Sequence, residues 1–560
     1  MILLYRIYES YFNFKTGPET FWYLPYMVNL ISTITRLRCR LPTRTSFPIR
    51  LNSTSTSTNL NDDIYQIKTK TKHSIHPTAP ARTRFAPSPT GYLHLGSLRT
   101  ALYNYLLAKN TGGSFILRIE DTDRSRLNSD AEKNIFDTLK WCNLSIDESS
   151  NDGGKYGPYR QSERKEIYAE YADILLKKGL AYKCFCSKER LIELRESARL
   201  LKPPTNVTYD RKCLSTNEST EDRPYVIRFK SPHHYPKFND LLHGELNLQP
   251  QYNSKDQRFD DFIIIKNDGM PTYHFANIID DHLMKITHVI RGEEWLPSTP
   301  KHIALYKAFD WEPPQYIHIP LLTSLEDKKL SKRKGDFNIL ELQKQEILPQ
   351  ALINFVALFG WAPSRELNEK FSEVMTLESL VQNFSLNHLT KGNVKVNQSK
   401  LHFFQKEHFS KIVQTGGEEF DKLIDDYLPG FLKYSNGKDK SYLIKITKLL
   451  APNISKISDI KQHEYLFKDV KNTILKPPRD VVLSKKIIDQ VLESAKLAPL
   501  NQVIEEELGS GIFKKKDIFM TLRASLSNGQ SGLPIPSIIE LLGDEECINR
   551  LQSYRDNILK

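Results

Sequence analysis

The chain has 560 residues, of which 39% are hydrophobic and 26% charged, a composition that is ordinary for a globular protein. Its 79 basic and 67 acidic residues give a formal charge of +12, which is mild support for a polyanionic partner such as a nucleic acid. Six cysteines in so long a chain exclude a disulfide framework, and no apolar run approaches the roughly 20 residues that span a bilayer. The length predicts about two to four domains and no membrane insertion.

Residues 1–80 do not have the composition of a folded segment. There is no Asp or Glu between Thr20 and Asn61, whereas Ser and Thr dominate residues 53–58 and arginine recurs at Arg36, Arg38, Arg40, Arg44 and Arg50. This composition is typical of a mitochondrial presequence and predicts a protein of the mitochondrial matrix. The alternative is a disordered basic tail that binds RNA. Met27 opens a more typical presequence than Met1, so the true start stays open.

The first half of a predicted α/β domain occupies residues 81–180. Residues 84–97 read Arg-Phe-Ala-Pro-Ser-Pro-Thr-Gly-Tyr-Leu-His-Leu-Gly-Ser and predict the end of a strand, a rigid loop and a helix that begins near Ser97. Backbone N–H groups and the helix dipole at such a start favour a bound phosphate. His94 can donate to a phosphate oxygen, and Gly96 permits close approach. The His-x-Gly segment alone is equally consistent with an ordinary capping loop.

The complete string closely resembles the amino-acid and ATP site of class I glutamyl-tRNA synthetases of the bacterial and organellar type. The segment from His94 to Ser97 stands at the place of the HIGH motif, with Ser for the final His. The resemblance implies an α/β Rossmann-like catalytic domain with an inserted connective domain, followed by an all-α C-terminal anticodon-binding region. It implies that His94 and Gly96 serve ATP binding and catalysis, and that Arg84, Ala86 and Ser88 line the glutamate pocket. Arg84 would face the side-chain carboxylate of glutamate.

A second strand is predicted at residues 114–119, and it ends in Glu120-Asp121-Thr122-Asp123. Carboxylates at the carboxyl end of a parallel strand lie where open α/β sheets bind ligands, although a solvated acidic turn would look the same. Residues 118–124 and 157–164 extend the resemblance, which implies that Glu120 holds the amino group of the substrate. A helix over residues 165–179 closes this half.

Residues 181–260 interrupt the α/β pattern and resemble the connective domain that contacts the acceptor end of tRNA. Cys184, Cys186, Tyr209 and Cys213 have a spacing that suits a structural zinc site, with the phenol as the fourth ligand. Some bacterial relatives carry zinc in this arrangement and others have lost it. Thiols left over from an ancestral site are the alternative.

The second half of the α/β domain is expected at residues 261–335, beginning with a buried parallel strand at 261–265. The resemblance places Tyr273, Asn277 and Arg291 around the glutamate, and Glu294 near the ATP ribose. Asp280, Asp281, His282 and Glu293 could form a metal cluster, but the resemblance assigns them to packing and helix capping. The expected metal is Mg²⁺ that arrives with ATP.

Residues 329–333 read Lys-Leu-Ser-Lys-Arg and match the second class I signature, KMSKS. A basic run is usually a solvated loop. Two signatures in order, with an insertion between them, make coincidence improbable. The resemblance assigns Lys329, Ser331 and Lys332 to ATP binding, and the two lysines also to catalysis.

Helical periods dominate the remainder, at residues 348–359, 445–450, 481–497 and 538–551. The resemblance assigns residues 336–410 to a stem-contact region and residues 411–560 to a helical anticodon-binding domain. The alternative for the latter is a helical oligomerisation or scaffold domain.

The predicted reaction is ATP-dependent activation of L-glutamate to its adenylate and transfer to tRNA-Glu in mitochondrial translation. A guanidinium, from Arg84 or Arg291, would distinguish the substrate carboxylate from the amide of glutamine. The rivals are a glutaminyl-tRNA synthetase, the short paralogue that glutamylates queuosine in tRNA, and an RNA-binding protein derived from a synthetase. Charging of tRNA-Gln, followed by a partner amidotransferase, stays open. A monomer is expected.

Overall fold

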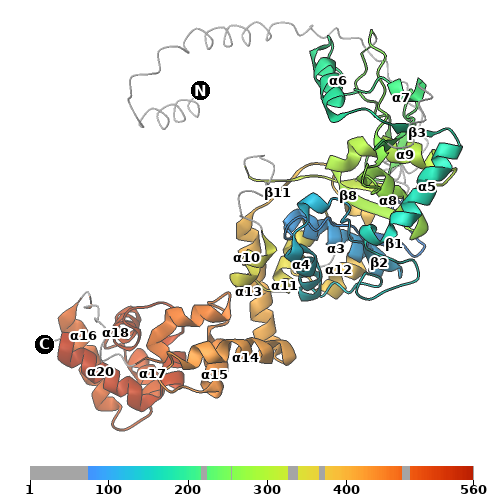
Figure 1. Ribbon diagram of the computed structural model, residues 1–560. Helices are drawn as coiled ribbons and strands as arrows, with labels where there is room; N and C mark the ends of the chain where they lie inside the picture. The colour runs from blue at the N-terminus through green and yellow to red at the C-terminus, as the bar shows by residue number, and fades with distance from the viewer. Residues whose placement is uncertain are drawn as a thin grey trace, which may run out of the picture. The chain divides into compact units, whose positions relative to one another are not determined.

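The computed structural model describes residues 74–215, 223–253, 255–325, 338–364, 372–468, 478 and 480–558 (Figure 1). The predicted presequence and the KMSKS-like residues Lys329, Ser331 and Lys332 lie outside this part of the chain. Within it, no helix is both long and apolar enough to cross a membrane.

Two pairs of parallel strands form the centre of the α/β domain. β1 (Arg82–Phe85) pairs with β2 (Ser114–Leu117), and β8 (His288–Gly292) pairs with β9 (Gln315–Ile319). The Thr287 N–H donates to the first carbonyl of β1 at 2.9 Å, so the two pairs lie next to each other. Because parallel strands end on the same side, their carboxyl ends converge at one edge.

Two short strands extend this sheet from an unexpected part of the sequence. β5 (Phe238–Asp240) and β6 (Gly244–Leu246) pair antiparallel, and β5 is also hydrogen-bonded to β9. The sheet therefore has the order β6-β5-β9-β8. Both strands lie within residues 181–260, the stretch expected to form the insertion.

The strand predicted at residues 261–265 is real but differs from the expectation in its pairing. β7 (Ile263–Ile265) is antiparallel to β4 (Val226–Phe229), which is in turn antiparallel to β3 (Ala181–Cys184). The prediction of a parallel strand was therefore wrong. A continuous apolar run reports burial, here of Ile264 and Ile265, but burial does not determine the direction of the neighbouring strand.

α3 (Leu95–Asn110) packs against β1, β2 and β8, and Figure 1 shows α3, β1 and β2 together in blue. It begins earlier than the expected start near Ser97, because His94 is the N-cap and its Nδ1 accepts the Ser97 N–H at 3.3 Å. The other helices of the α/β domain and its insertion are α4 (Ser129–Trp141), α5 (Lys165–Lys177), α6 (Lys188–Leu200), α7 (Lys212–Ser215), α8 (Tyr273–Leu283) and α9 (Thr299–Ala308).

The segment after β9 is mainly helical. β10 (Leu322–Thr323) pairs in parallel with β11 (Val394–Lys395). Four helices, α10 (Ile339–Lys344), α11 (Pro349–Ala357), α12 (Leu377–Asn383) and α13 (Gln398–Thr415), accompany them. Apolar side chains of these helices share one continuous core with α3, β1, β2 and β9. This region is thus built onto the α/β domain by burial of common apolar surface.

The C-terminal helices enclose a second core. They are α14 (Glu418–Leu432), α15 (Lys440–Leu450), α16 (Val481–Ser494), α17 (Leu500–Ser510), α18 (Lys515–Ser527), α19 (Ile535–Leu542) and α20 (Asp544–Ile558). The helical period expected over residues 538–551 is divided between α19 and α20. Gly543, with φ of 85°, ends α19 in a backbone conformation that ordinary side chains rarely adopt.

Residues just before the α/β domain are also built into the fold. Ile75 N–H donates to the Asn387 side chain at 2.8 Å, and His76 Nε2 lies 2.7 Å from Asn110 Oδ1. Since the Leu386 N–H donates to His76 Nδ1, Nε2 carries the ring proton and donates to Asn110. The folded part of the chain therefore includes Ser74 to His76.

Candidate active site

The loop after β1 is held rigidly beside the end of β2. The Glu120 N–H donates to the Pro87 carbonyl at 3.0 Å, and the Asn128 N–H donates to the Pro89 carbonyl at 3.0 Å. These bonds place Ala86, which is partly buried, and Ser88, which is exposed, next to the acidic stretch after β2. The two segments that were assigned to one pocket on the basis of resemblance are thus neighbours in space.

His94 and Gly96 form the first turn of α3. His94 Nε2 lies 3.2 Å from Ser97 Oγ, and the first turn contains no acidic residue. A Cβ on Gly96 would lie only 3.2 Å from His94 Cε1, so the missing side chain leaves room for the imidazole. The positive end of an uncompensated helix dipole, together with this histidine, makes a site that suits a phosphate group.

Arg84, the residue expected at the substrate carboxylate, has a partner within the protein. Its Nε lies 3.1 Å from Asp281 Oδ1 and its Nη2 lies 3.3 Å from Asp281 Oδ2, with both side chains buried. Arg118 donates to the same carboxylate at 2.6 Å and to Glu120 Oε1 at 3.1 Å. Burial favours the neutral acid at Asp281, but the charges of the two arginines outweigh it and hold the Asp281 pKa below its usual value.

The neighbouring Asp280 is held in the same way. It accepts hydrogen bonds from Arg164 Nε at 2.7 Å, from the Gln161 amide at 2.8 Å and from the Tyr168 hydroxyl. The two carboxylates of α8 therefore act as ion-pair centres that join α8 to β1, β2 and α5. The expectation that they serve packing agrees with these contacts, whereas neither caps a helix.

Arg291, at the end of β8, is surrounded differently. Its Nε lies 3.0 Å from His318 Nε2, its Nη2 lies 2.8 Å from Thr299 Oγ1, and its Nη1 contacts the Tyr273 hydroxyl and His302 Nδ1, each at 3.3 Å. The side chain is buried, and in the described residues it forms no ion pair with a carboxylate. It is a buried cation held only by neutral groups.

A buried amide without partners among the described residues lies on the same helix as Tyr273. Asn277 is 1% exposed, and neither its amide nitrogen nor its oxygen has a hydrogen-bond partner among the described residues. The Tyr273 ring packs on Trp295 at 4.2 Å between centroids, and the charges of Arg291, Glu120 and Arg84 all act on its phenol. Burial raises the Glu120 pKa in spite of the nearby arginines. Arg291 contacts Tyr273, the charge of Glu120 acts on the same phenol, and Asn277 lies one turn further along α8.

Glu294 is the second residue after β8 and lies at the surface. A Cβ on Gly292 would lie 2.1 Å from Glu294 Oε2, so this carboxylate folds back over the glycine. The absence of a side chain at Gly292 therefore fixes where the Glu294 carboxylate lies.

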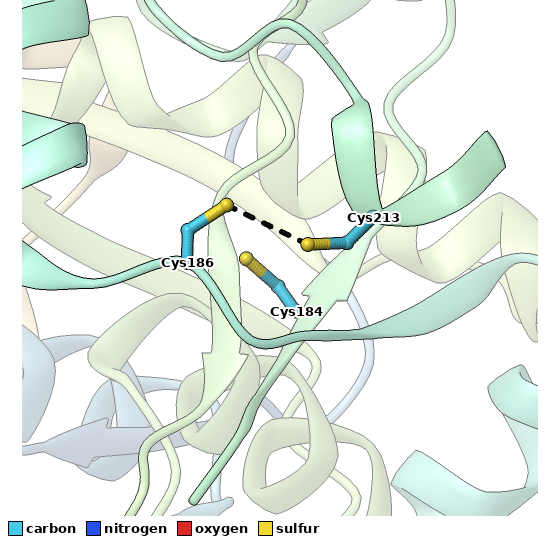
Figure 2. A group of neighbouring side chains, drawn as sticks. All are labelled: Cys184, Cys186 and Cys213. Carbon is cyan, nitrogen blue, oxygen red and sulfur yellow. Dashed lines mark hydrogen bonds between the residues drawn. The ribbon is translucent and has the colours of Figure 1, made fainter. Parts of the chain in front are cut away.

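The cysteine cluster lies in the insertion, and Figure 2 shows its three sulfur atoms directed toward one another. Cys186 Sγ and Cys213 Sγ are 3.5 Å apart, and the three sulfur atoms all lie within 4.8 Å of one another. The Tyr209 hydroxyl lies 3.2 Å from Cys184 Sγ and 3.5 Å from Cys186 Sγ. In a tetrahedral zinc site, Zn–S bonds of 2.3 Å separate sulfur atoms by about 3.8 Å, so this donor set fits zinc.

Several residues that shape the site were missed at the level of sequence. Arg118 lay within a resembling string but received no role, and Asp240, Thr299, His302 and His318 were not identified. Asp240 and His318 are 78 residues apart in sequence and share no short motif. Only the pairing of β5 with β9 brings them together, so no local signal could have revealed them.

The fold and this constellation define a class I aminoacyl-tRNA synthetase. Residues 80–403 match the family described as tRNA synthetases class I (E and Q), catalytic domain, and residues 419–555 match an anticodon binding domain. Together with the relatives described next, these matches show that the chain belongs to the family of glutamate–tRNA ligases. The expected fold class, with its helical C-terminal region, is thereby confirmed.

The similar proteins cover most of the chain. The mitochondrial glutamate–tRNA ligase of Saccharomyces cerevisiae is 48% identical over 500 residues, which are 86% of this chain and 92% of the relative. The glutamate–tRNA ligase of Clostridioides difficile is 37% identical over 509 residues, which are 85% and 99% of the two chains. A crystal structure of a glutamate tRNA ligase from Elizabethkingia meningosepticum, in complex with its amino acid, has a TM-score of 0.73 at 32% identity and covers 86% of this chain and 100% of its own.

Replacement of Gly96 by Ala separates stability from activity. Alanine is the better helix former by up to about 1 kcal/mol, which offsets a weakened His94 N-cap bond of about the same size, so the melting temperature should change little. The new Cβ displaces the His94 imidazole, so kcat for glutamylation of tRNA should fall roughly ten- to hundredfold. Gly509→Ala, on α17 where a Cβ meets no atom within 4 Å, is the matched control. An unchanged kcat in Gly96→Ala would refute a role for this turn.

Replacement of Asp281 by Asn should lower the free energy of unfolding by about 3–5 kcal/mol at neutral pH, because Arg84 and Arg118 lose a buried counter-charge. The folded-state pKa of Asp281 is depressed, so its stabilisation is complete above the unfolded value of about 3.9 and is lost as the pH falls through the folded value.

Urea unfolding of both proteins across pH should therefore show a difference that is largest near pH 7 and shrinks below about pH 4. Asp173→Asn removes an exposed ion pair with Lys177 and should change stability little. A difference between wild type and Asp281→Asn that does not depend on pH would contradict the ion-pair explanation.

Proposed function

We propose that the chain is a mitochondrial glutamate–tRNA ligase that works in the matrix. It activates L-glutamate with ATP and transfers the glutamyl group to tRNA-Glu. The observation that carries the proposal is the set of buried polar side chains formed by Arg291, Tyr273 and Asn277. Among the described residues it combines a buried cation without a carboxylate partner and a buried amide without any partner, which is the environment that a charged amino acid would satisfy.

The amino acid occupies the space between β1, β2 and the start of α8. Arg291 binds the side-chain carboxylate of glutamate, and Tyr273 and Asn277 form hydrogen bonds with the polar groups of the substrate. Glu120, beside the end of β2, faces the amino group, and Ala86 and Ser88 form the wall next to it. Arg84 lies behind this pocket and adds positive potential, while its pairing with Asp281 keeps it in place.

ATP lies against the start of α3, where His94 and the backbone at Gly96 contact its phosphate oxygens. Glu294 binds the ribose hydroxyls. Lys329, Ser331 and Lys332, which lie outside the described residues, supply charge from the other side on the basis of their match to the second signature. Mg²⁺ that enters with ATP supplies further neutralisation of the phosphates.

Little covalent help is required of the protein in this reaction. The carboxylate of glutamate attacks the α-phosphate and pyrophosphate leaves, so the enzyme mainly aligns the two reactants and stabilises charge on phosphate oxygens. His94 is suited to this purpose because its Nδ1 accepts the Ser97 N–H, which fixes the ring at the helix start before substrate binds.

Cys184, Cys186, Cys213 and Tyr209 hold a structural zinc ion that joins β3 to α7. The distances between these donor atoms support the proposal. Zinc would supply cross-linking between segments of the insertion, which is otherwise tied together by few apolar side chains.

Metal analysis of the purified protein should find about one zinc per chain, and Cys213→Ser should lose it. Cys547→Ser, which changes a buried cysteine of α20, should retain it. Chelation should lower the melting temperature of wild type but not of Cys213→Ser. Absence of zinc from wild type expressed in zinc-supplemented medium would favour the alternative of leftover thiols.

The function is tested by aminoacylation with protein that starts at Ser74, since Ile75 and His76 are part of the fold. Radiolabelled glutamate and, separately, glutamine are each offered with mitochondrial tRNA-Glu and tRNA-Gln. Glutamate on tRNA-Glu is the expected product. Attachment of glutamine, or of neither amino acid, would overturn the proposal.

The same experiment decides the breadth of tRNA charging. Glutamate on tRNA-Glu alone establishes a discriminating enzyme. Glutamate on both tRNAs establishes dual charging, and an amidotransferase that converts Glu-tRNA-Gln then becomes a required functional partner. Sedimentation of the same preparation tests the expected monomer.

A further inference from the structure

The guanidinium of Arg291 is held by neutral acceptors alone in the described part of the chain. Its four hydrogen bonds go to the imidazoles of His318 and His302, to the Thr299 hydroxyl and to the Tyr273 phenol. This contrasts with Arg84 and Arg118, whose charges are balanced by carboxylates at distances of 2.6 to 3.1 Å. The two kinds of buried arginine lie in one site, so the difference needs a structural cause.

The cause lies in the proton positions of the histidines. An arginine can only donate hydrogen bonds, so His318 Nε2, 3.0 Å from Arg291 Nε, must be the acceptor. The single proton of the neutral ring is then on Nδ1, which lies 2.7 Å from Asp240 Oδ2. Asp240 therefore fixes the tautomer that His318 needs in order to hold Arg291.

Both carboxylate oxygens of Asp240 already accept hydrogen bonds within the protein. Its Oδ1 accepts the N–H groups of Leu242 and His243 at 2.9 Å each, and its Oδ2 accepts the His318 N–H at 3.1 Å in addition to the ring. The residue is 0% exposed, as is His318. A carboxylate with this many donors cannot swing toward Arg291, so its charge stays one imidazole ring away from the guanidinium.

The ring between them stays neutral. Burial lowers the His318 pKa to about 4, against the opposing effect of the hydrogen bond that the ring donates to Asp240. Burial likewise holds the His302 pKa well below its usual value. At neutral pH the guanidinium thus has a fixed orientation and its full positive charge. Hydrogen bonds to neutral groups orient a cation without neutralising its charge.

We propose that Asp240 and His318 are positioning residues for recognition of the glutamate carboxylate. They aim Arg291 at the substrate and leave the substrate as its counter-ion. The inference rests on the proposed function, in which Arg291 contacts that carboxylate. It explains how the site selects an acid over an amide: the side chain of glutamine carries no charge, so a buried cation at the side-chain position would stay uncompensated.

Substitutions at the two positions separate tautomer control from packing. In Asp240→Asn the amide nitrogen faces the His318 ring, which then shifts its proton to Nε2 and opposes the Arg291 donor. His318→Leu removes the acceptor, whereas in His318→Gln the amide oxygen lies near the place of Nε2 and can accept from Arg291. His408→Gln is the control. His408 is another buried histidine, on α13, and its Nε2 lies 3.0 Å from Asn354 Oδ1.

Aminoacylation kinetics and melting temperatures of these variants decide the matter. The KM for glutamate should rise about ten- to hundredfold in Asp240→Asn and His318→Leu, while the KM for ATP stays within about twofold. His318→Gln should restore the glutamate KM to within about threefold of wild type. His408→Gln should leave both constants unchanged.

Three results would overturn the inference. The first is an unchanged glutamate KM in both disruptive variants. The second is an equal rise of both KM values with a lower melting temperature, which a purely structural role predicts. The third is a failure of His318→Gln to differ from His318→Leu, and this comparison decides the question if Asp240→Asn does not fold. Failure of the proposed function is distinguishable, because wild type itself would then not attach glutamate.

Discussion

The structure depends on a buried ion-pair network centred on Asp281. This carboxylate accepts from Arg84 of β1 and from Arg118 just after β2, and Asp280 beside it accepts from Arg164 and Tyr168. Transfer of isolated charges into a core is strongly unfavourable, so these groups are stable only as a connected set. The network therefore fixes α8 against the ends of β1 and β2. That placement in turn sets the position of Tyr273 and Asn277, which lie on α8.

The same site contains a cation that is treated in the opposite way. Arg291 is as buried as Arg84 but has only neutral partners in the described residues, with Asp240 held back behind His318. Balanced arginines provide rigidity, and the unbalanced one provides affinity for an anion. Rigidity and anion affinity are both provided in one small site because strands from distant parts of the sequence end at the same edge of the sheet. β5 contributes Asp240 although it lies in the stretch where sequence predicted an insertion.

An apolar run in the sequence predicts a strand but does not predict whether the strand is parallel or antiparallel to its neighbour. The apolar residues of β7 were expected in the parallel sheet, yet they pair antiparallel with β4, which separates β7 from the strand that ends at Cys184. Cys184 itself lies within 3.2 Å of the Tyr209 hydroxyl, and the other two cysteines lie close by. Sequence spacing named a group of side chains that the fold brings together, but the distances between their donor atoms follow from the folding of β3, α7 and the loop between them.

The sequence by itself determined the family, the α/β class of the catalytic domain and the helical nature of the C-terminal region. Those conclusions rest on local strings, such as residues 84–97, and on periodicity, and both are properties of contiguous residues. It also named Glu120, Tyr273, Asn277 and Arg291, which the fold brings into one neighbourhood. Only the tertiary structure decided which arginine is neutralised and which is not. That outcome depends on contacts between residues 78 to 197 positions apart, such as Asp240 with His318 and Arg84 with Asp281, and no local pattern encodes them.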